Sequence, residues 1–250
     1  MLTQERQSGI VRLVQQHGAM TVTELADIYQ TSSSTIRRDL TALDEQHLLH
    51  KVFGGATALI QNQTPLEESL ESKQQKNIEA KISLARYAAG LIEPQDLVYI
   101  DAGSTTEQLS AFIMEKTATY VTNSIPLSCK LAKRGFNVRL VGGIVKPTTE
   151  AVIGSQARQI IQKLNFNIGF FGANGVTIKE GYTTPEMEEA EGKSTALTHC
   201  KRPFILADAS KVGIISGVSF APLKAAGLIT NQLMNQDLKN HTLVKEVDQL

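Results

Sequence analysis

The segment from Ser33 to Leu40 reads Ser-Ser-Thr-Ile-Arg-Arg-Asp-Leu, and it opens a predicted helix that runs to about Glu45. Ile36, Leu40 and Leu43 recur at helical spacing, so they form the inward face of this helix. Ser32 or Ser33 is suited to cap its start, because a serine hydroxyl accepts a hydrogen bond from a free backbone amide. The polar side chains left on the outer face and near the helix start are Ser33, Ser34, Thr35, Arg37 and Arg38.

Two helices are predicted before this segment and a β-hairpin after it. Apolar residues between Ile10 and Val14 recur at helical spacing and predict a first helix that ends near Gly18. The sequence Thr21-Val22-Thr23-Glu24 is a capping box, so a short second helix follows, with Leu25, Ile28 and Tyr29 on its buried face. Residues 48–53 alternate between apolar and polar, and Gly54-Gly55 permits a tight turn. Residues 1–60 therefore predict a winged helix-turn-helix domain.

The outward residues of this module fit double-stranded DNA. Arginine binds guanine bidentately in the major groove, and hydroxyl and guanidinium groups also bind phosphate. We expect DNA contacts from Ser33, Ser34, Thr35, Arg37, Arg38 and, in the hairpin, Lys51. Net charge gives no support, because residues 1–60 hold five basic and six acidic side chains and the whole chain holds 25 of each. Binding must depend on a few placed contacts, and a surface for another protein is the alternative.

Three motifs of this module are shared with a known family. They are Glu5-Arg6, the segment Ser34–Leu40, and Val52-Phe53-Gly54-Gly55-Ala56. In these the chain resembles DeoR-type sugar-operon repressors, over nearly its whole length. The resemblance implies a repressor of operator DNA that senses a phosphorylated sugar and associates with itself as a dimer or tetramer. Relatives often have Gly where this chain has His47, so we expect His47 to adopt a positive-φ turn at some cost. They often have Arg and His where this chain has His50 and Phe53, so we expect the hairpin to bind phosphate less strongly.

Beyond this module the composition changes twice. Residues 61–80 are polar, charged and glutamine-rich, which is typical of a linker. From residue 81 onward, helices alternate with short apolar strands, predicted at 97–100, 120–122, 138–141, 168–171, 204–207 and 228–230. Such alternation predicts an α/β fold with a doubly wound, mostly parallel sheet. We therefore expect a separate effector domain over residues 81–250.

Polar turns follow several of these strands, at the edge where ligands bind in open parallel sheets. The segments Asp101–Thr106 and Thr122–Ser124 offer backbone amides and hydroxyls to an anion such as phosphate. The predicted effector site comprises Asp101, Gly103, Ser104, Thr105, Thr106, Thr122, Asn123, Ser124, Asn174, Gly175, Thr183, Thr184, Glu188, Lys193, Asp208 and Lys211. Ordinary strand-to-helix turns are the alternative. A solvated side chain is as good an interpretation of Lys193 as a ligand role, whereas Lys211 follows a predicted buried strand and is the stronger candidate.

The same segments resemble the effector domain of that family, which is similar to the fold of ribose-phosphate isomerase and glucosamine-phosphate deaminase. In this resemblance Asp101–Thr106 is the phosphate loop. Within the family, the stretches 99–107, 183–190 and 206–213 resemble fructose-operon repressors of Gram-positive bacteria, which implies fructose 1-phosphate as the inducer. Asn167 and Ala209 stand where relatives usually have Asp and Ser, and the charge lost at Asn167 would alter effector affinity or choice if that Asp orients a pocket group.

The remaining composition argues against several classes of protein. Cys129 and Cys200 are isolated and fit no metal-binding spacing. The N-terminus lacks the apolar core of a signal peptide, and no run of about 18 apolar residues exists. We expect a cytoplasmic protein without a membrane span, metal, cofactor or catalytic residues. The alternative is a sugar-phosphate isomerase with Asp101, Glu188 and Glu189 as its carboxylates, but a DNA-binding module is hard to explain on such an enzyme.

Overall fold

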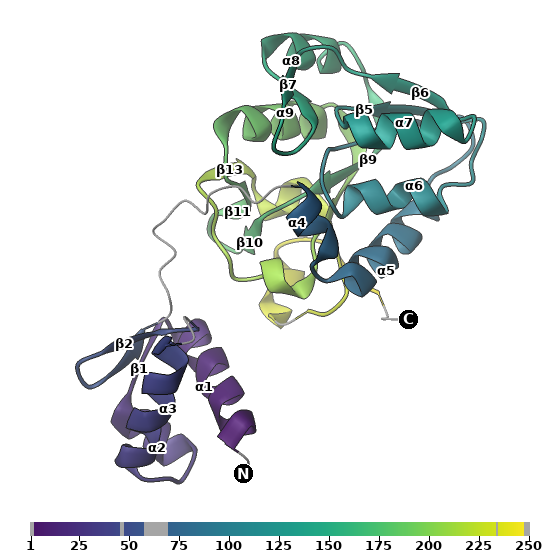
Figure 1. The fold of residues 1–250 in the computed structure, drawn as a ribbon. Helices are drawn as coiled ribbons and strands as arrows, with labels where there is room; N and C mark the ends of the chain where they lie inside the picture. Colours follow the sequence, from purple (N-terminus) through teal and green to yellow (C-terminus); the bar gives the residue numbers. More distant parts are fainter. Residues whose placement is uncertain (1–2, 46–47, 58–69, 234, 248–250) are drawn as a thin grey trace. The chain divides into compact units, whose positions relative to one another are not determined.

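The chain forms two compact units, Met1–Gln63 and Thr64–Leu250 (Figure 1). The computed structural model describes residues 3–45, 48–57, 70–233 and 235–247. His47 and the first part of the predicted linker, residues 61–69, lie outside the described residues. Each unit has its own hydrophobic core. No helix within these ranges is long and apolar enough to cross a membrane.

The first unit is a winged helix-turn-helix, as predicted. Its elements are α1 (Thr3–His17), β1 (Ala19–Thr21), α2 (Val22–Ile28), α3 (Ser33–Glu45), β2 (His50–Val52) and β3 (Gly55–Thr57). The core joins the three helices through Ile10, Leu25, Ile36 and Leu40, which are fully buried. The predicted capping box is present, since Thr21 Oγ1 accepts from the Glu24 amide and the Glu24 carboxylate accepts from the Thr21 amide.

Two details of this unit differ from the sequence predictions. Ile28 is 53% exposed, because α2 ends there and buries Val22, Leu25 and Ala26 instead. The wing is a three-stranded antiparallel sheet of order β1-β3-β2, in which β1 adds a strand to the predicted hairpin. Gly55 is required there, since a Cβ atom at this position would lie 2.2 Å from the Met20 carbonyl oxygen.

The second unit is built on a seven-stranded parallel sheet of order β15-β14-β12-β9-β4-β5-β6. The strands are β4 (Leu97–Ile100), β5 (Thr119–Thr122), β6 (Asn137–Leu140), β9 (Phe166–Gly172), β12 (Cys200–Leu206), β14 (Gly227–Thr230) and β15 (Val244–Glu246). The chain moves outward from β4 through β5 to β6 on one side. It then returns to β9 and moves outward on the other side, so the strand order reverses between β4 and β9. The predicted doubly wound sheet is confirmed.

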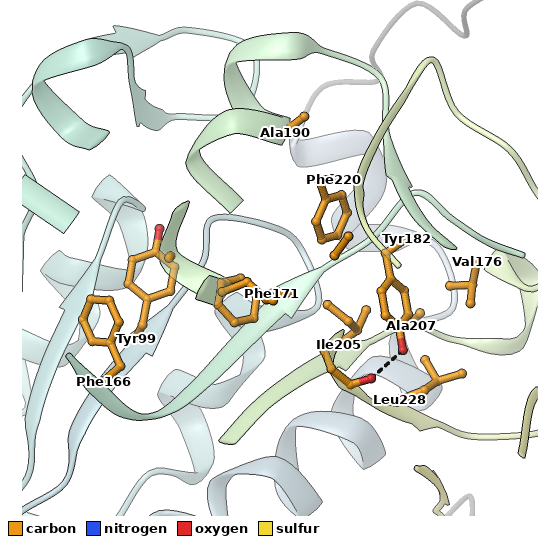
Figure 2. Close-up of a cluster of buried hydrophobic side chains, with 14 of the residues drawn as sticks. Tyr99, Phe166, Phe171, Val176, Tyr182, Ala190, Ile205, Ala207, Phe220 and Leu228 are labelled. Carbon is orange, nitrogen blue, oxygen red and sulfur yellow. Dashed lines mark hydrogen bonds between the residues drawn. The ribbon is translucent and has the colours of Figure 1, made fainter. Parts of the chain in front are cut away.

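Successive residues of the central strands enter two different cores. Val98 and Ile100 contribute to the core on one face and Tyr99 to the core on the other, and Phe170 and Phe171 divide in the same way. Adjacent side chains of a strand point to opposite faces, so a strand buried on both faces is apolar throughout. Figure 2 shows one of these cores, with Tyr99, Phe166 and Phe171 in contact at ring-centroid distances of 5.0 and 5.4 Å from Tyr99.

Helices cover both faces of the sheet (Figure 1). Side chains of α5 (Ile78–Ala89), α6 (Leu109–Phe112) and α7 (Ile125–Lys133) pack on one face. The other face is covered by α8 (Ser155–Ile161), α9 (Met187–Thr198) and a small antiparallel sheet of β10 (Gly175–Thr177), β11 (Gly181–Thr184) and β13 (Val218–Ala221). A hairpin of β7 (Ile144–Lys146) and β8 (Ala151–Ile153), which the sequence did not predict, follows β6.

The described part of the predicted linker is largely helical. Residues 70–75 form α4 (Leu70–Gln75), and α5 begins at Ile78 rather than near Ile82. Leu70 is buried, as are Ala80 and Leu84 of α5, so these apolar side chains anchor the segment to the second unit. The linker interpretation missed this because Leu70 is followed by seven polar residues, so no helical spacing of apolar residues marks α4.

Candidate functional site

The outer face of α3 is exposed and its inner face is fixed by an ion pair. Arg37 and Arg38 are exposed, and neither side chain has a hydrogen-bond partner among the described residues. Asp39, the next residue, is only 4% exposed. Its carboxylate accepts from Arg6 Nε of α1 at 2.6 Å and from Gln7 Nε2 at 3.1 Å. The ion pair therefore ties α3 to α1 while the two arginines face solvent.

The hydroxyls at the start of α3 form a local cluster. Ser32 Oγ accepts from the Thr35 amide at 3.2 Å and lies 2.8 Å from Ser34 Oγ and 2.9 Å from Thr35 Oγ1. Ser33 and Ser34 are exposed and Thr35 is half-buried. Ser32 is therefore the residue that caps α3. The predicted residues Ser33, Ser34, Arg37 and Arg38 are all accessible at one end and one face of the helix.

The wing is joined to the second half of α3. Lys51 Nζ donates to Thr41 Oγ1 at 2.7 Å, and the Lys51 amide donates to Asp44 Oδ1 at 3.0 Å. The Lys51 ammonium is thus partly engaged within the unit. At the tip of the wing the Phe53 side chain is fully exposed. The sequence-based expectation that the wing has a reduced hold on phosphate stays a prediction.

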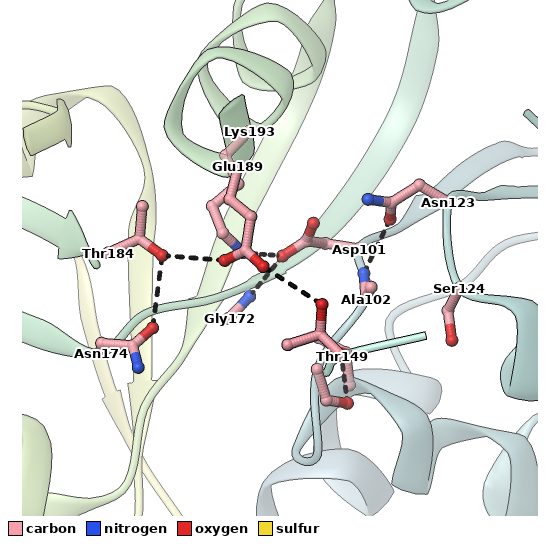
Figure 3. Close-up of polar contacts among 12 residues, drawn as sticks. Asp101, Ala102, Asn123, Ser124, Thr149, Gly172, Asn174, Thr184, Glu189 and Lys193 are labelled. Carbon is pink, nitrogen blue, oxygen red and sulfur yellow. Dashed lines mark hydrogen bonds and ion pairs between the residues drawn. The ribbon is translucent and has the colours of Figure 1, made fainter. Parts of the chain in front are cut away.

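In the second unit, polar groups converge where the strand order reverses (Figure 3). Asp101 directly follows β4, and its Oδ2 accepts from the Gly172 amide at the end of β9 at 3.2 Å. Lys193 of α9 forms an ion pair with the same oxygen, and both side chains are less than 10% exposed. Burial raises the pKa of the Asp101 carboxyl, and Lys193 acts in the opposite direction. Because Lys193 is buried and paired, the solvated alternative for this residue is wrong.

Glu189, one turn before Lys193 on α9, is the centre of a second set of contacts. Its carboxylate accepts from Lys146 Nζ at 2.9 Å and from the hydroxyls of Thr149 and Thr184, each at 3.3 Å. Burial acts to raise the pKa of Glu189, but the charges of Lys193 and Lys146 outweigh it and the pKa is lowered. The same Thr184 hydroxyl also lies 3.4 Å from Asn174 Oδ1. The network therefore joins α9, β11, the β7–β8 hairpin and the end of β9.

A small cleft, partly open to solvent, adjoins these residues. Asp101, Asn123, Glu188, Glu189 and Lys193 line it, as predicted for four of the five. Its other wall is formed by β8 and α8, including Arg158, which pairs with Glu191 at 2.5 Å. Asn123 Oδ1 accepts from the Ala102 amide at 2.8 Å, which fixes the loop after β4. Within the described residues no group of His, Cys, Asp or Glu is arranged to bind a metal.

The loop Gly103–Thr105 offers unused hydrogen-bond donors. The hydroxyls of Ser104 and Thr105 and the backbone amides of Gly103, Ser104 and Thr105 have no acceptor among the described residues. Thr106, by contrast, donates its hydroxyl to the Gly103 carbonyl at 3.0 Å. This shapes the loop into a turn that leads to the short helical segment at Thr106–Gln108. Five donors close together suit an oxyanion with several acceptors.

Other predicted effector residues make structural contacts. Thr122 Oγ1 accepts from the Ser124 amide, and Ser124 Oγ caps α7. Thr183 Oγ1 accepts from the Ser216 amide at 2.9 Å, and Gly175 approaches the Ile214 carbonyl so closely that no Cβ would fit. Asp208 caps the turn at Ala209–Lys211. Lys211 is half-exposed, and its ammonium has no partner among residues whose placement is described.

Sequence reasoning missed several members of the network. Lys146 and Thr149 come from the unpredicted β7–β8 hairpin, and Glu189 was considered only as a possible catalytic carboxylate. Their separations from Glu189 are 43 and 40 residues, so no local pattern connects them. One signal in the sequence could have indicated that Glu189 belongs with Lys193: the two residues are four apart, so they share one face of a helix.

Comparisons with known proteins place both units in one family. Residues 6–62 match the model of the DeoR-like helix-turn-helix domain, and residues 76–232 match the DeoR C terminal sensor domain. The chain is 37% identical over 252 residues to a protein named "Uncharacterized HTH-type transcriptional regulator FruR" from Bacillus subtilis, covering 99% of each chain. It is 33% identical to the lactose phosphotransferase system repressor of Staphylococcus epidermidis, covering 94% of this chain and 93% of the repressor.

A further relative is the HTH-type transcriptional regulator GlpR of Haloferax volcanii, at 32% identity over 95% of this chain and 93% of that protein. Among solved structures, ribose 5-phosphate isomerase A from Neisseria gonorrhoeae aligns with 55% of this chain and 54% of its own, at 15% identity and a TM-score of 0.39. Both family models match, each over most of its unit, and the Bacillus subtilis relative aligns with nearly the whole chain. The chain therefore belongs to the DeoR family of transcriptional regulators.

Proposed function

We propose that the chain is a repressor of a sugar-utilisation operon, which binds double-stranded operator DNA through α3 and releases it when a phosphorylated sugar binds the second unit. The observation that carries the first half is the contrast within α3 between the buried Asp39 and two exposed arginines that have no partner among the described residues. Repression, rather than activation, is supported by relatives whose names call them repressors.

In this proposal Arg37 and Arg38 contact base edges or phosphates in the major groove, with Ser33, Ser34 and Thr35 near the helix start and Lys51 in the wing. Because the unit is not basic, one unit alone would bind weakly, and affinity would depend on two or more units acting together on spaced half-sites. Self-association as a dimer or tetramer is therefore part of the proposal.

In the sensor half of the proposal, one set of protein groups binds the phosphate of the ligand and another set binds its sugar hydroxyls. The amides and hydroxyls of Gly103–Thr105 would bind the phosphate, since these clustered donors have no acceptor among the described residues. Asp101, Asn123, Glu189 and Lys193, beside the cleft, would bind sugar hydroxyls. Lys211 is a further candidate for the phosphate. Fructose 1-phosphate is the first ligand to test, because of the motif resemblance to fructose-operon repressors.

The DNA half is tested with a duplex selected from a random library by the wild-type chain. Arg37→Ala should lose specific binding while keeping its thermal response to sugar phosphate. Arg12→Ala removes an exposed arginine from α1 and is the matched control, which should bind within about twofold of wild type. Operator affinity unchanged in Arg37→Ala would reject the assignment of α3. Binding with no salt dependence would instead favour a protein-interaction surface.

The sensor half is tested by thermal unfolding in the presence of fructose 1-phosphate, fructose 6-phosphate, tagatose 6-phosphate and inorganic phosphate. A bound effector raises the melting temperature by mass action. We expect fructose 1-phosphate to give the largest shift and Lys211→Ala to bind DNA but resist release. Normal release of that variant would remove Lys211 from the site. Turnover of any of these sugars would favour the isomerase alternative.

A further inference from the structure

α4 is the first described element that follows the winged-helix unit in the chain, and it is short. A helix of six residues is not stable by itself in water, so its position depends on the contacts it makes. Two of those contacts, and a third made by Asn77 just after the helix, reach loops of the sensor unit. Each loop either belongs to the candidate site or follows directly from it. Figure 1 shows α4 beside α5.

The first contact is with the loop between β7 and β8. The Leu70 amide donates to the Thr148 carbonyl at 3.0 Å, and the buried Leu70 side chain anchors this end of α4. The neighbouring Thr149 donates to Glu189, at the centre of the polar network. Lys73 of α4 also lies near enough to Glu189 that its charge helps to lower the pKa of that carboxyl. The N-terminal part of α4 is therefore connected to Glu189 in two ways.

The second contact is with the segment after the Gly103–Thr105 loop. Gln74 Nε2 donates to Glu107 Oε2 at 2.8 Å, and Lys130 of α7 pairs with the other carboxylate oxygen at 2.7 Å. Glu107 is 3% exposed, and its amide donates to the Gly103 carbonyl at 2.9 Å. A change in the shape of the 103–105 loop would move Glu107 and, through Gln74, α4.

The third contact is with the turn after β12. Asn77, between α4 and α5, donates through Nδ2 to Asp208 Oδ1 at 3.1 Å and to Ser210 Oγ at 3.2 Å. Its backbone is left-handed, with a φ of 51°, a conformation that Asn tolerates better than most residues. Lys211, a proposed phosphate ligand, directly follows Ser210. The joint between α4 and α5 is thus tied to the third loop of the candidate site.

From these contacts we propose that α4, together with Asn77 at its end, is the coupling element of this regulator. Occupancy of the sugar-phosphate site changes the Thr148 and Glu107 contacts of α4 and the Asp208 contact of Asn77, and this change reaches the chain that leads to the winged-helix unit. The inference rests on the function proposed above and adds the path between its two sites. Gln74 and Asn77 are positioning residues in it, since neither is assigned to the ligand. Coupling in allosteric proteins is typically 5- to 150-fold in affinity, which a few such contacts are sufficient to carry.

The test uses the full chain with both substitutions, Gln74→Ala and Asn77→Gly. Glycine keeps the left-handed backbone at 77 without strain and removes the side chain whose amide bonds Asp208 and Ser210. Gln75→Ala is the matched control, because Gln75 is exposed on the same helix and its side chain has no partner in the described structure. Affinity for the selected duplex is measured with and without saturating fructose 1-phosphate, and affinity for the sugar with and without DNA.

In wild type and in Gln75→Ala, fructose 1-phosphate should weaken DNA binding by at least about fivefold, and DNA should weaken sugar binding by the same factor. In the double variant the affinity for DNA without sugar and the affinity for sugar without DNA should each stay within about twofold of wild type. The ratio by which each ligand weakens binding of the other should fall to about one. A double variant that keeps the wild-type factor would overturn the proposal, as would one that has lost either binding by itself. A wild-type chain that binds DNA but ignores the sugar would reject the proposed function, and the coupling with it.

Discussion

Asp39 of α3 is buried whereas Arg37 and Arg38 are exposed, and this difference separates a structural residue from two candidate DNA ligands. Residue type alone does not show this difference, because all three residues of Arg-Arg-Asp are charged and charged side chains are usually exposed. The spacing of Ile36, Leu40 and Leu43 does predict it, since Asp39 is three residues after Ile36 and therefore shares the buried face. The partner, Arg6, is 33 residues away and could not be identified from spacing.

Asp39→Ala should destabilise the winged-helix unit by about 2 kcal/mol, because it leaves Arg6 half-buried and unpaired. Urea unfolding followed by circular dichroism measures the change. Asp27→Ala is the matched control, since Asp27 is exposed on α2 and its side chain has no partner in the described ranges. Equal stability of the two variants would contradict the role given to the Arg6–Asp39 pair.

Glu189 gives the sensor unit a predictable response to acid. A carboxyl whose pKa is lowered on folding stabilises the fold above its unfolded pKa, and this stabilisation is lost as the pH falls through the folded pKa. The stability difference between wild type and Glu189→Gln should therefore shrink as the pH is lowered from about 6 to about 3. The measurement is urea unfolding at each pH. A difference that grows toward acid would mean that burial, not Lys146 and Lys193, controls this group.

At the scale of elements, the sequence predicts best where a segment is buried on a regular period. The central strands are apolar throughout because both faces are covered, and the Thr21–Glu24 capping box marks the start of α2. β1, α4 and the β7–β8 hairpin were not predicted. Each is short, and each is held by contacts from distant segments rather than by its own pattern: β1 pairs with β3, and α4 depends on Thr148, Glu107 and Asp208.

Gly55→Ala should damage the wing more than Gly54→Ala. Gly54 has a φ of 87° but open space around it, so alanine there costs about 1–2 kcal/mol of backbone strain. At Gly55 a Cβ atom meets the Met20 backbone, so β1 must separate from β3. Thermal unfolding and operator affinity of the two variants provide the comparison. The reverse order of stability would show that β1 is not needed for the wing.

At the scale of the whole molecule, the chain combines two units with separate cores, and each candidate site is described from the residues of one unit. The sequence predicted that the polar turns after β4, β5 and β9 lie at one edge of the sheet, because the carboxyl ends of parallel strands share an edge. It did not predict which residues of those turns face one another. Asp101, Glu189 and Lys193 meet only because α9 crosses the edge where the strand order reverses.

The central claim is that a sugar phosphate bound to the second unit changes the affinity of the first unit for DNA. Fluorescence anisotropy of the selected duplex, titrated with the wild-type chain in the absence and presence of fructose 1-phosphate, measures this directly. The account predicts binding that weakens by at least about fivefold at saturating sugar phosphate and at constant salt. The same affinity at a sugar concentration that fully stabilises the protein against heat would contradict it.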